Sequence, residues 1–365
     1  MKIGIITFHK ALSYGSEYQS FALQQYLTKL GHHVEIIDYV PKRFKFFHLV
    51  FKQSTNKPLK ERLIKYLPYI ACKCTEYITT QLFVKKHLTL SKKSYEDSNS
   101  FEENLLDYDV YVTGSDQVWN FNLDSFETVK PYLLSFANKT AKKISYASSI
   151  GMDSYDDLDS ELKDNARNLL LEYSAISVRE KRAVEILKSI GVESQWVLDP
   201  TFLLNSQDWE KLAKPKSIKG KYVFVHGLYR NKELYKFANK LAKENNLKVV
   251  NLANCYDFNL KAKNEVFVSC EKLLSYIRDA ECVVTDSFHG TALSINMNTP
   301  LYIFPALRYN SRLASLVNLL NLQNRYIVDK DYDNKAIKMD YTEINSILNE
   351  ERKKSYDFLE RAINE

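Results

Sequence analysis

Cys282-Val283-Val284-Thr285 is a short apolar run typical of a buried strand, and the polar turn Asp286-Ser287-Phe288-His289-Gly290-Thr291 follows it directly. We expect residues 291–296 to form a helix and residues 301–304 to form the next buried strand. Strands that alternate with helices in this way are typical of a parallel sheet covered by helices. This part of the sequence therefore predicts an α/β fold.

The same alternation extends to both sides of this segment. In the second half of the chain we expect further strands at residues 222–228 and 248–252, and helices at residues 232–244, 273–278 and 311–320. In the first half we expect a helix at residues 17–30, which Gly31 would cap, and strands at residues 2–7, 34–38, 110–113, 143–148 and 175–178. The pattern predicts two Rossmann-like domains in tandem with a cleft between them.

The domain boundaries follow from composition. We expect the first domain at residues 1–204 and the second at residues 221–330, joined by a polar, lysine-rich linker at residues 205–220. A charged amphipathic helix at residues 341–363 is expected to pack back across a domain.

The composition indicates a soluble, cytoplasmic protein. Of the 365 residues, 45% are apolar and 26% are charged, which is ordinary for a globular protein. No apolar run approaches the roughly 18 residues of a membrane span, and residues 1–7 lack the pattern of a signal peptide. The five cysteines are scattered and odd in number, so we expect reduced thiols.

Residues 41–93 form a basic, aromatic-rich segment with 13 Lys/Arg and two Glu, a net charge of +11. Three prolines, at positions 41, 58 and 68, predict several short helices here rather than one long helix. One interpretation is a solvated helical insertion packed on the first domain. The other is a surface for an anionic partner, such as the inner face of a membrane or a lipid-linked diphosphate. Nucleic acid is not expected as a partner, because the chain contains no recognisable nucleic-acid-binding module.

Polar loops at the predicted strand ends are the candidate binding sites, because ligands of such sheets bind at the carboxyl ends of the strands. Tyr14 and Gly15 precede the first helix, where backbone N–H groups favour a phosphate or carboxylate, although simple helix capping is the alternative. The loop lacks the Gly-x-Gly-x-x-Gly spacing, so a dinucleotide cofactor is not indicated. Asp116, Gln117 and Asn120 follow another strand and suit sugar hydroxyls, or they form a turn and a helix cap.

Arg179 follows the strand at residues 175–178, where its guanidinium would match a carboxylate or phosphate in a bidentate way. An ion pair with Glu180 or another nearby acid is the alternative for Arg179. Arg308 and Arg312 precede a helix, and they could add positive charge to the same cleft or brace the edge of the domain.

His289 is the strongest candidate for a catalytic residue. An imidazole, with its ordinary pKa of about 6.5, can both donate and accept a proton near neutral pH. Ser287, Gly290 and Thr291 lie in the same turn, and the backbone N–H groups at the start of the helix would face an anion. His226 also ends a predicted strand and could reach the same cleft.

Taken in order, these motifs resemble those of the polysaccharide pyruvyl transferase family, and they cover nearly the whole chain. The residues that carry the resemblance are Tyr14-Gly15 with Gln19, Gly114-Ser115-Asp116-Gln117-Val118-Trp119-Asn120, Ser145-Tyr146-Ala147, Ser177-Val178-Arg179-Glu180, Leu198-Asp199-Pro200-Thr201 and Asp286-Ser287-Phe288-His289-Gly290. Family members often have Asn where this chain has Ser13, and the basic segment 41–93 matches no motif of the family.

The resemblance implies a two-domain fold like that of GT-B glycosyltransferases. It also implies transfer of a pyruvyl group from phosphoenolpyruvate to two hydroxyls of a sugar in a cell-surface polysaccharide or its lipid-linked precursor, which forms a cyclic ketal. His289 would be the general acid or would protonate the departing phosphate, while Arg179, a second arginine and helix amides would bind the donor. Asp116 and Asp286 are the candidates for the base. Phosphoenolpyruvate would be the donor substrate, and we expect no cofactor and no metal.

Two other functions stay open. The chain could be a GT-B glycosyltransferase that uses a nucleotide-sugar, with His289 and the helix amides holding its diphosphate. It could also be a non-catalytic module that tethers a polysaccharide-assembly complex to the membrane through residues 41–93.

Overall fold

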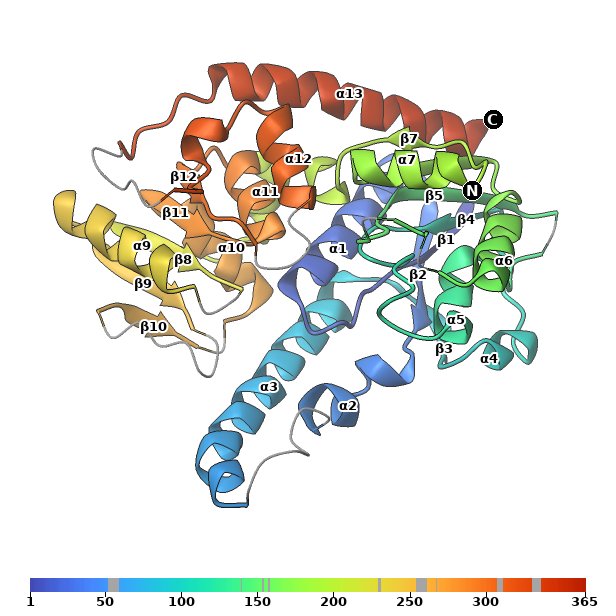
Figure 1. Cartoon of the computed structure of the whole chain (residues 1–365), viewed down its shortest axis with the longest axis horizontal. Helices are drawn as coiled ribbons and strands as arrows, with labels where there is room; N and C mark the ends of the chain where they lie inside the picture. The colour runs from blue at the N-terminus through green and yellow to red at the C-terminus, as the bar shows by residue number, and fades with distance from the viewer. Residues whose placement is uncertain are drawn as a thin grey trace. The chain divides into compact units, whose positions relative to one another are not determined.

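The computed structural model describes residues 1–51, 59–138, 140–152, 154–156, 158–228, 231–253, 261–266, 268–306, 311–329 and 336–365, and for residues 50, 51, 59–69 and 72 it describes the backbone alone. The chain divides into two compact units (Figure 1). Unit 1 comprises Met1–Lys45, Phe83–Leu203 and Asn349–Glu365, and unit 2 comprises Phe46–Leu82 and Leu204–Leu348. Each unit contains one parallel β-sheet, which confirms the predicted α/β class with two Rossmann-like folds in tandem.

Unit 1 is built on a seven-stranded sheet whose paired strands all run parallel, in the order β3-β2-β1-β4-β5-β6-β7. The strands are β1 (Lys2–Ile6), β2 (His33–Tyr39), β3 (Leu90–Tyr95), β4 (Val110–Thr113), β5 (Lys142–Ser148), β6 (Ala175–Val178) and β7 (Gln195–Trp196). The order reverses between β1 and β4. A crevice at the carboxyl ends of two such strands is where ligands of doubly wound sheets bind.

Helices cover both faces of this sheet. Because side chains alternate across a strand, Val110 and Val112 of β4 enter one core while Tyr111 enters the other. The first core lies under α1 (Tyr14–Lys29) and the end of α13 (Thr342–Asn364). The second lies under α5 (Phe126–Val129), α6 (Ser160–Leu170) and α7 (Lys181–Ser189).

Unit 2 repeats the design with a five-stranded parallel sheet in the order β10-β9-β8-β11-β12. Its strands are β8 (Tyr222–His226), β9 (Lys248–Leu252), β10 (Lys263–Glu265), β11 (Cys282–Thr285) and β12 (Leu301–Ile303). Its helices include α8 (Ser206–Leu212), α9 (Lys232–Glu244), α10 (Cys270–Arg278), α11 (Phe288–Asn296) and α12 (Ser311–Leu319). The order reverses between β8 and β11, so His226 and the turn after Thr285 end the two strands at the switch point.

The C-terminal helix packs back on the first sheet, as the sequence predicts. Phe358, Leu359, Ala362 and Ile363 of α13 are buried in the core that contains Ile3 and the apolar residues of its neighbouring strands. Helix α13 also bonds to this unit, because Ser355 Oγ accepts a hydrogen bond from the backbone N–H of Leu198 (3.0 Å).

Three sequence predictions about local structure are wrong. The basic segment begins with two short helices, η1 (Lys42–Phe44) and α2 (Phe46–Phe51), but the rest does not break, because α3 (Leu59–His87) runs as one helix through position 68. A proline removes one hydrogen bond from a helix and bends it, but the residues beyond it can continue the helix. Strand β3 (Leu90–Tyr95) begins inside the predicted insertion, and the predicted linker contains α8, whose Trp209 is fully buried.

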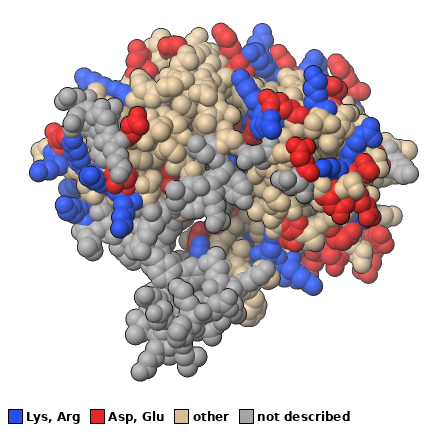
Figure 2. Space-filling view, in the orientation of Figure 1, with Lys and Arg blue, Asp and Glu red and all other residues tan. Residues whose placement is uncertain are grey.

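Surface charge is uneven on unit 1. Acidic side chains gather over α4 (Asn99–Glu102), α5 and the segments beside them, where Glu96, Asp97, Glu102, Glu103, Asp107 and Glu127 are exposed (Figure 2). Among the described residues, no helix is long and apolar enough to cross a membrane.

Candidate active site

The first polar cluster lies at the switch point of the unit 1 sheet. Helix α1 begins at Tyr14, three residues earlier than predicted, so Tyr14 and Gly15 lie in its first turn. Ser16 Oγ donates a hydrogen bond to Asp116 Oδ2 (2.9 Å), which joins the start of α1 to the loop after β4. The structure thus brings together two of the loops that the sequence proposed as binding sites.

Asp116 adopts an unusual backbone conformation, with φ of 73°. Only Asp, Asn and Gly visit this left-handed region readily, and such positions are often functional. Its carboxylate also accepts a hydrogen bond from the backbone N–H of Gln117 (2.9 Å), and its side chain is 16% exposed. Asp116 is therefore a fixed carboxylate that a ligand can still reach.

Arg179 lies in an ion pair with Asp199, which is the alternative that the sequence left open. Its Nη1 is 2.6 Å from Asp199 Oδ2, while Asp116 and Glu180 lie 3.8 and 3.9 Å from other guanidinium nitrogens. Burial lowers the pKa of Arg179, but the three carboxylates outweigh it and hold the pKa above its ordinary value. A direct contact between Arg179 and a ligand stays a prediction.

Gln117 and Asn120 lie in the same loop but bond to each other. Asn120 Nδ2 donates to Gln117 Oε1 (2.9 Å) and to the carbonyl oxygen of Gly151 (3.2 Å). Both side chains are buried, so their use for sugar hydroxyls also stays a prediction.

The remaining family motifs support this edge of the sheet. Ser145 and Ser177 bond reciprocally, since Ser145 Oγ donates to the Ser177 carbonyl (3.0 Å) and Ser177 Oγ donates to the Ser145 carbonyl (2.9 Å). Asp199 caps the short helix at Pro200–Phe202, because its Oδ1 accepts a hydrogen bond from the backbone N–H of Thr201 (2.9 Å); Thr201 Oγ1 donates to the same oxygen (2.7 Å). These motifs hold β5, β6 and the Asp199 loop in register, which places Arg179.

The second polar cluster lies at the switch point of the unit 2 sheet. Helix α11 begins at Phe288, so His289 and Gly290 belong to its first turn rather than to a loop before it. Ser287 caps the helix, because its Oγ accepts a hydrogen bond from the Gly290 N–H (3.2 Å). His289 is half-buried, and Thr291 is fully buried.

Asp286 is fully buried, and its Oδ1 accepts a hydrogen bond from the backbone N–H of Leu228 (2.6 Å). The carboxylate thereby ties the turn after β11 to the loop after β8. Of the two predicted candidates for the base, Asp116 is the partly exposed one.

His226 ends strand β8, and the sequence proposed that it could reach the cleft. The structure places His226 in register with Thr285 and leaves the residue only 5% exposed. Burial and the charge of His289 lower the pKa of His226 to about 4. The sequence shows that His226 lies at the end of a strand. It does not show that this strand pairs with β11, because strand order cannot be read from the sequence.

The structure describes only one of the two arginines predicted to lie after β12. Arg312 lies in the first turn of α12 and is half-buried, whereas Arg308 lies outside the described residues. Among the described residues, no group of three His, Cys, Asp or Glu side chains is arranged to hold a metal ion.

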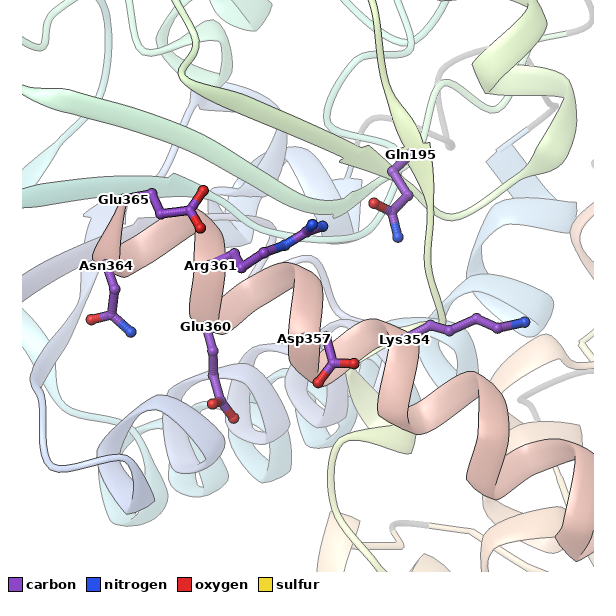
Figure 3. A pocket seen from close by; sticks show the side chains of 7 residues that line it. All are labelled: Gln195, Lys354, Asp357, Glu360, Arg361, Asn364 and Glu365. Carbon is purple, nitrogen blue, oxygen red and sulfur yellow. The ribbon is translucent and has the colours of Figure 1, made fainter.

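A pocket of about 590 Å³ lies elsewhere in unit 1, beside the edge strand β7. It is lined by Gln195, Lys354, Asp357, Glu360, Arg361, Asn364 and Glu365, and the Arg361 side chain extends toward Gln195 (Figure 3). Its charges are mixed, and none of the strand-end residues lines it. Each unit therefore has its candidate binding cluster at the switch point of its own sheet.

Comparison with known proteins gives one family. A family model described as polysaccharide pyruvyl transferase matches residues 14–305. A search of curated proteins finds no match.

Similar solved structures include UDP-GlcNAc 2-epimerase from Methanocaldococcus jannaschii, with a TM-score of 0.47 and 14% identity over 100% of this chain and 93% of that chain. Another is UDP-N-acetylglucosamine 2-epimerase from Rickettsia bellii, with a TM-score of 0.45 and 11% identity over 100% of this chain and 96% of that chain. The spinosyn forosaminyltransferase SpnP has a TM-score of 0.46 and 10% identity over the full length of both chains.

Proposed function

Because the chain belongs to the polysaccharide pyruvyl transferase family, we propose that it transfers a pyruvyl group from phosphoenolpyruvate to two hydroxyls of one sugar, forming a cyclic ketal. The acceptor would be a sugar of a cell-surface polysaccharide or of its lipid-linked precursor. The observation that carries this proposal is the family match across residues 14–305, which includes both switch-point clusters.

The reaction needs one proton donor and one anion site. Protonation of the methylene carbon of phosphoenolpyruvate creates an oxocarbenium-like centre at C2. One sugar hydroxyl adds to C2 and loses its proton. The C2–O bond to phosphate then breaks, and the second hydroxyl adds to C2 and loses its proton. The products are the ketal and inorganic phosphate. The two hydroxyls release two protons: one leaves on the phosphate, and the other replaces the proton that was added to the methylene carbon.

We assign the proton donor to His289. Its position in the first turn of α11 supports this role, because a helix N-terminus stabilises a bound phosphate. Ser287, Gly290 and Thr291 line the same turn, and Arg312 begins the neighbouring helix α12. A positioned general acid contributes roughly 10²–10⁴-fold to the rate.

We assign acceptor binding and proton removal to the unit 1 cluster. Asp116 is the proposed base, because its carboxylate is partly exposed and is held by Ser16 and Gln117. Gln117 and Asn120 follow Asp116 in the same loop, and Tyr14 and Gly15 precede Ser16, which bonds to Asp116. These four residues are the proposed neighbours of the acceptor sugar. Arg179 is proposed to contact the donor while it holds Asp116 in place.

A lipid-linked acceptor would bring the protein to the inner face of a membrane, and the basic segment 41–93 is the proposed contact. Two observations on α3 support it. Ile78 and Leu82 are exposed apolar residues, 55% and 59% accessible, one helical turn apart. Lys85 and Lys86 follow on the same side and are exposed.

The function is tested by incubating the protein with phosphoenolpyruvate and a panel of glycosyl acceptors while inorganic phosphate is measured. Acceptor-dependent phosphate release is expected from the wild type. His289→Ala should lower the turnover roughly 10²–10⁴-fold without changing the thermal unfolding midpoint. His33→Ala is the control, because the His33 side chain is 66% exposed and lies at the amino end of β2, away from the strand ends that carry the unit 1 cluster.

A glycosyltransferase would differ in the ligands that stabilise it against thermal unfolding. Nucleotide-sugars, and not phosphoenolpyruvate, would then raise the thermal unfolding midpoint. Near-normal phosphate release by His289→Ala would remove the proposed acid.

A further inference from the structure

His226 ends β8 directly beside the turn that carries His289. The register pairs His226 with Thr285, and Thr285 Oγ1 donates a hydrogen bond to the His226 carbonyl oxygen (2.7 Å). The backbone N–H of Ser287 in turn donates to Thr285 Oγ1 (3.0 Å). His226 is thus tied to the start of α11 through a single threonine.

One ring nitrogen of His226 faces the first turn of α11. Nδ1 is fully buried and has no hydrogen-bond partner among the residues that the structure describes. A Cβ atom placed on Gly290 would lie 2.7 Å from this nitrogen, so the ring packs directly against the glycine. A proton on Nδ1 would bury a donor with no acceptor, which is costly. The neutral ring therefore carries its proton on Nε2 and is a hydrogen-bond donor there.

The surroundings keep this ring neutral. Burial and the neighbouring charge of His289 lower the pKa of His226 to about 4, so at neutral pH the ring is uncharged.

A second buried polar atom lies in the same turn. Thr291 Oγ1 belongs to a fully buried residue and has no hydrogen-bond partner in the described part of the chain. The nine-residue helix α11 also directs the positive end of its dipole to this turn. An oxyanion bound at the start of α11 would meet a helix N-terminus beside the His226 imidazole.

We propose that His226 is a phosphate-binding residue, whose Nε2–H donates a hydrogen bond to an oxygen of the phosphate group held at the start of α11. His289 is then the proton donor, and His226 holds the same phosphate without adding a like charge beside it. This inference deepens the proposed function, since the phosphate would be that of phosphoenolpyruvate and of the released product.

Calorimetry tests the inference without turnover. It measures the binding of inorganic phosphate to the wild type and to two variants. The amide of His226→Gln reaches the place of Nε2, whereas the amide of His226→Asn reaches only that of Nδ1. We expect His226→Asn to weaken phosphate binding roughly tenfold or more, and His226→Gln to stay within about threefold of the wild type. Pyruvate, which has the carboxylate but no phosphate, should bind all three proteins alike.

Wild-type-like phosphate binding by His226→Asn would overturn the inference, and so would equal loss in both variants when both are folded. The ¹⁵N NMR shifts of the wild-type imidazole give a test that needs no variant. We expect an Nε2-protonated ring whose Nε2 resonance moves on addition of phosphate, and an Nδ1-protonated ring would contradict the proposal. Because these readouts need no donor turnover, they can succeed even where the pyruvyl transfer assay fails.

Discussion

Nη1 of Arg179 lies 2.6 Å from Oδ2 of Asp199, and both side chains are almost completely buried. Removing one partner of such a pair leaves an unpaired charge in a poorly solvated place. The pair therefore anchors the loop after β6 to the loop that follows β7.

We predict that Asp199→Ala lowers the free energy of unfolding by about 3–5 kcal/mol, because it leaves the Arg179 guanidinium buried beside fewer carboxylates. Urea unfolding measures the change. The control is Glu185→Ala, which removes the partner of Arg182 from an ion pair whose side chains are 52% and 64% exposed. That variant should stay within about 0.5 kcal/mol of the wild type.

Asp116→Asn separates the two candidates for the base. Asparagine tolerates the left-handed conformation at position 116, so the fold should persist while turnover falls roughly 10²–10⁴-fold. Asp286→Ala should instead lower stability, because it removes the buried carboxylate that accepts the Leu228 N–H. Wild-type turnover by Asp116→Asn would move the base to another residue.

Two glycines with similar backbone conformations give a matched pair. Gly151 and Gly191 have φ of 60° and 75°, so alanine at either position is strained by about 1–2 kcal/mol. A Cβ on Gly151 would also lie 2.7 Å from Gln117 Cδ, whereas at Gly191 the nearest atoms of Arg167 are 3.7 Å away. We predict that Gly151→Ala loses more stability than Gly191→Ala in urea, and that it alone reduces acceptor-dependent turnover. If both variants lost the same stability, the Gln117 side chain would have moved away from the new Cβ without an energetic cost.

The pH dependence of stability should report His226. Burial, and then the charge of His289, lower the His226 pKa from 6.5 to about 4, so the unfolded chain binds more protons between these pH values. The free energy of unfolding should therefore fall as the pH decreases from about 6.5 to about 4, by up to roughly 3 kcal/mol from this residue. Urea midpoints of the wild type at about pH 7.5, 6 and 5 measure this pH dependence. His226→Gln should flatten it, and an identical slope in that variant would contradict the assignment.

The sequence by itself determined the elements and the fold class. Alternating apolar strands and amphipathic helices located β4, β9, β11 and α9 at the residues where the structure has them, because these patterns depend on neighbours along the chain. The motif turns also marked the ends of the strands that carry Asp116 and His289.

Only the tertiary structure decided which of these residues meet. Ser16 and Asp116 are 100 residues apart in the chain, and Arg179 and Asp199 are 20 apart. Strands buried on both faces have similar apolar sequences, so the sequence does not specify which strand lies beside which. The strand order places β1 beside β4 and β8 beside β11, and it is this pairing that brings His226 against Gly290.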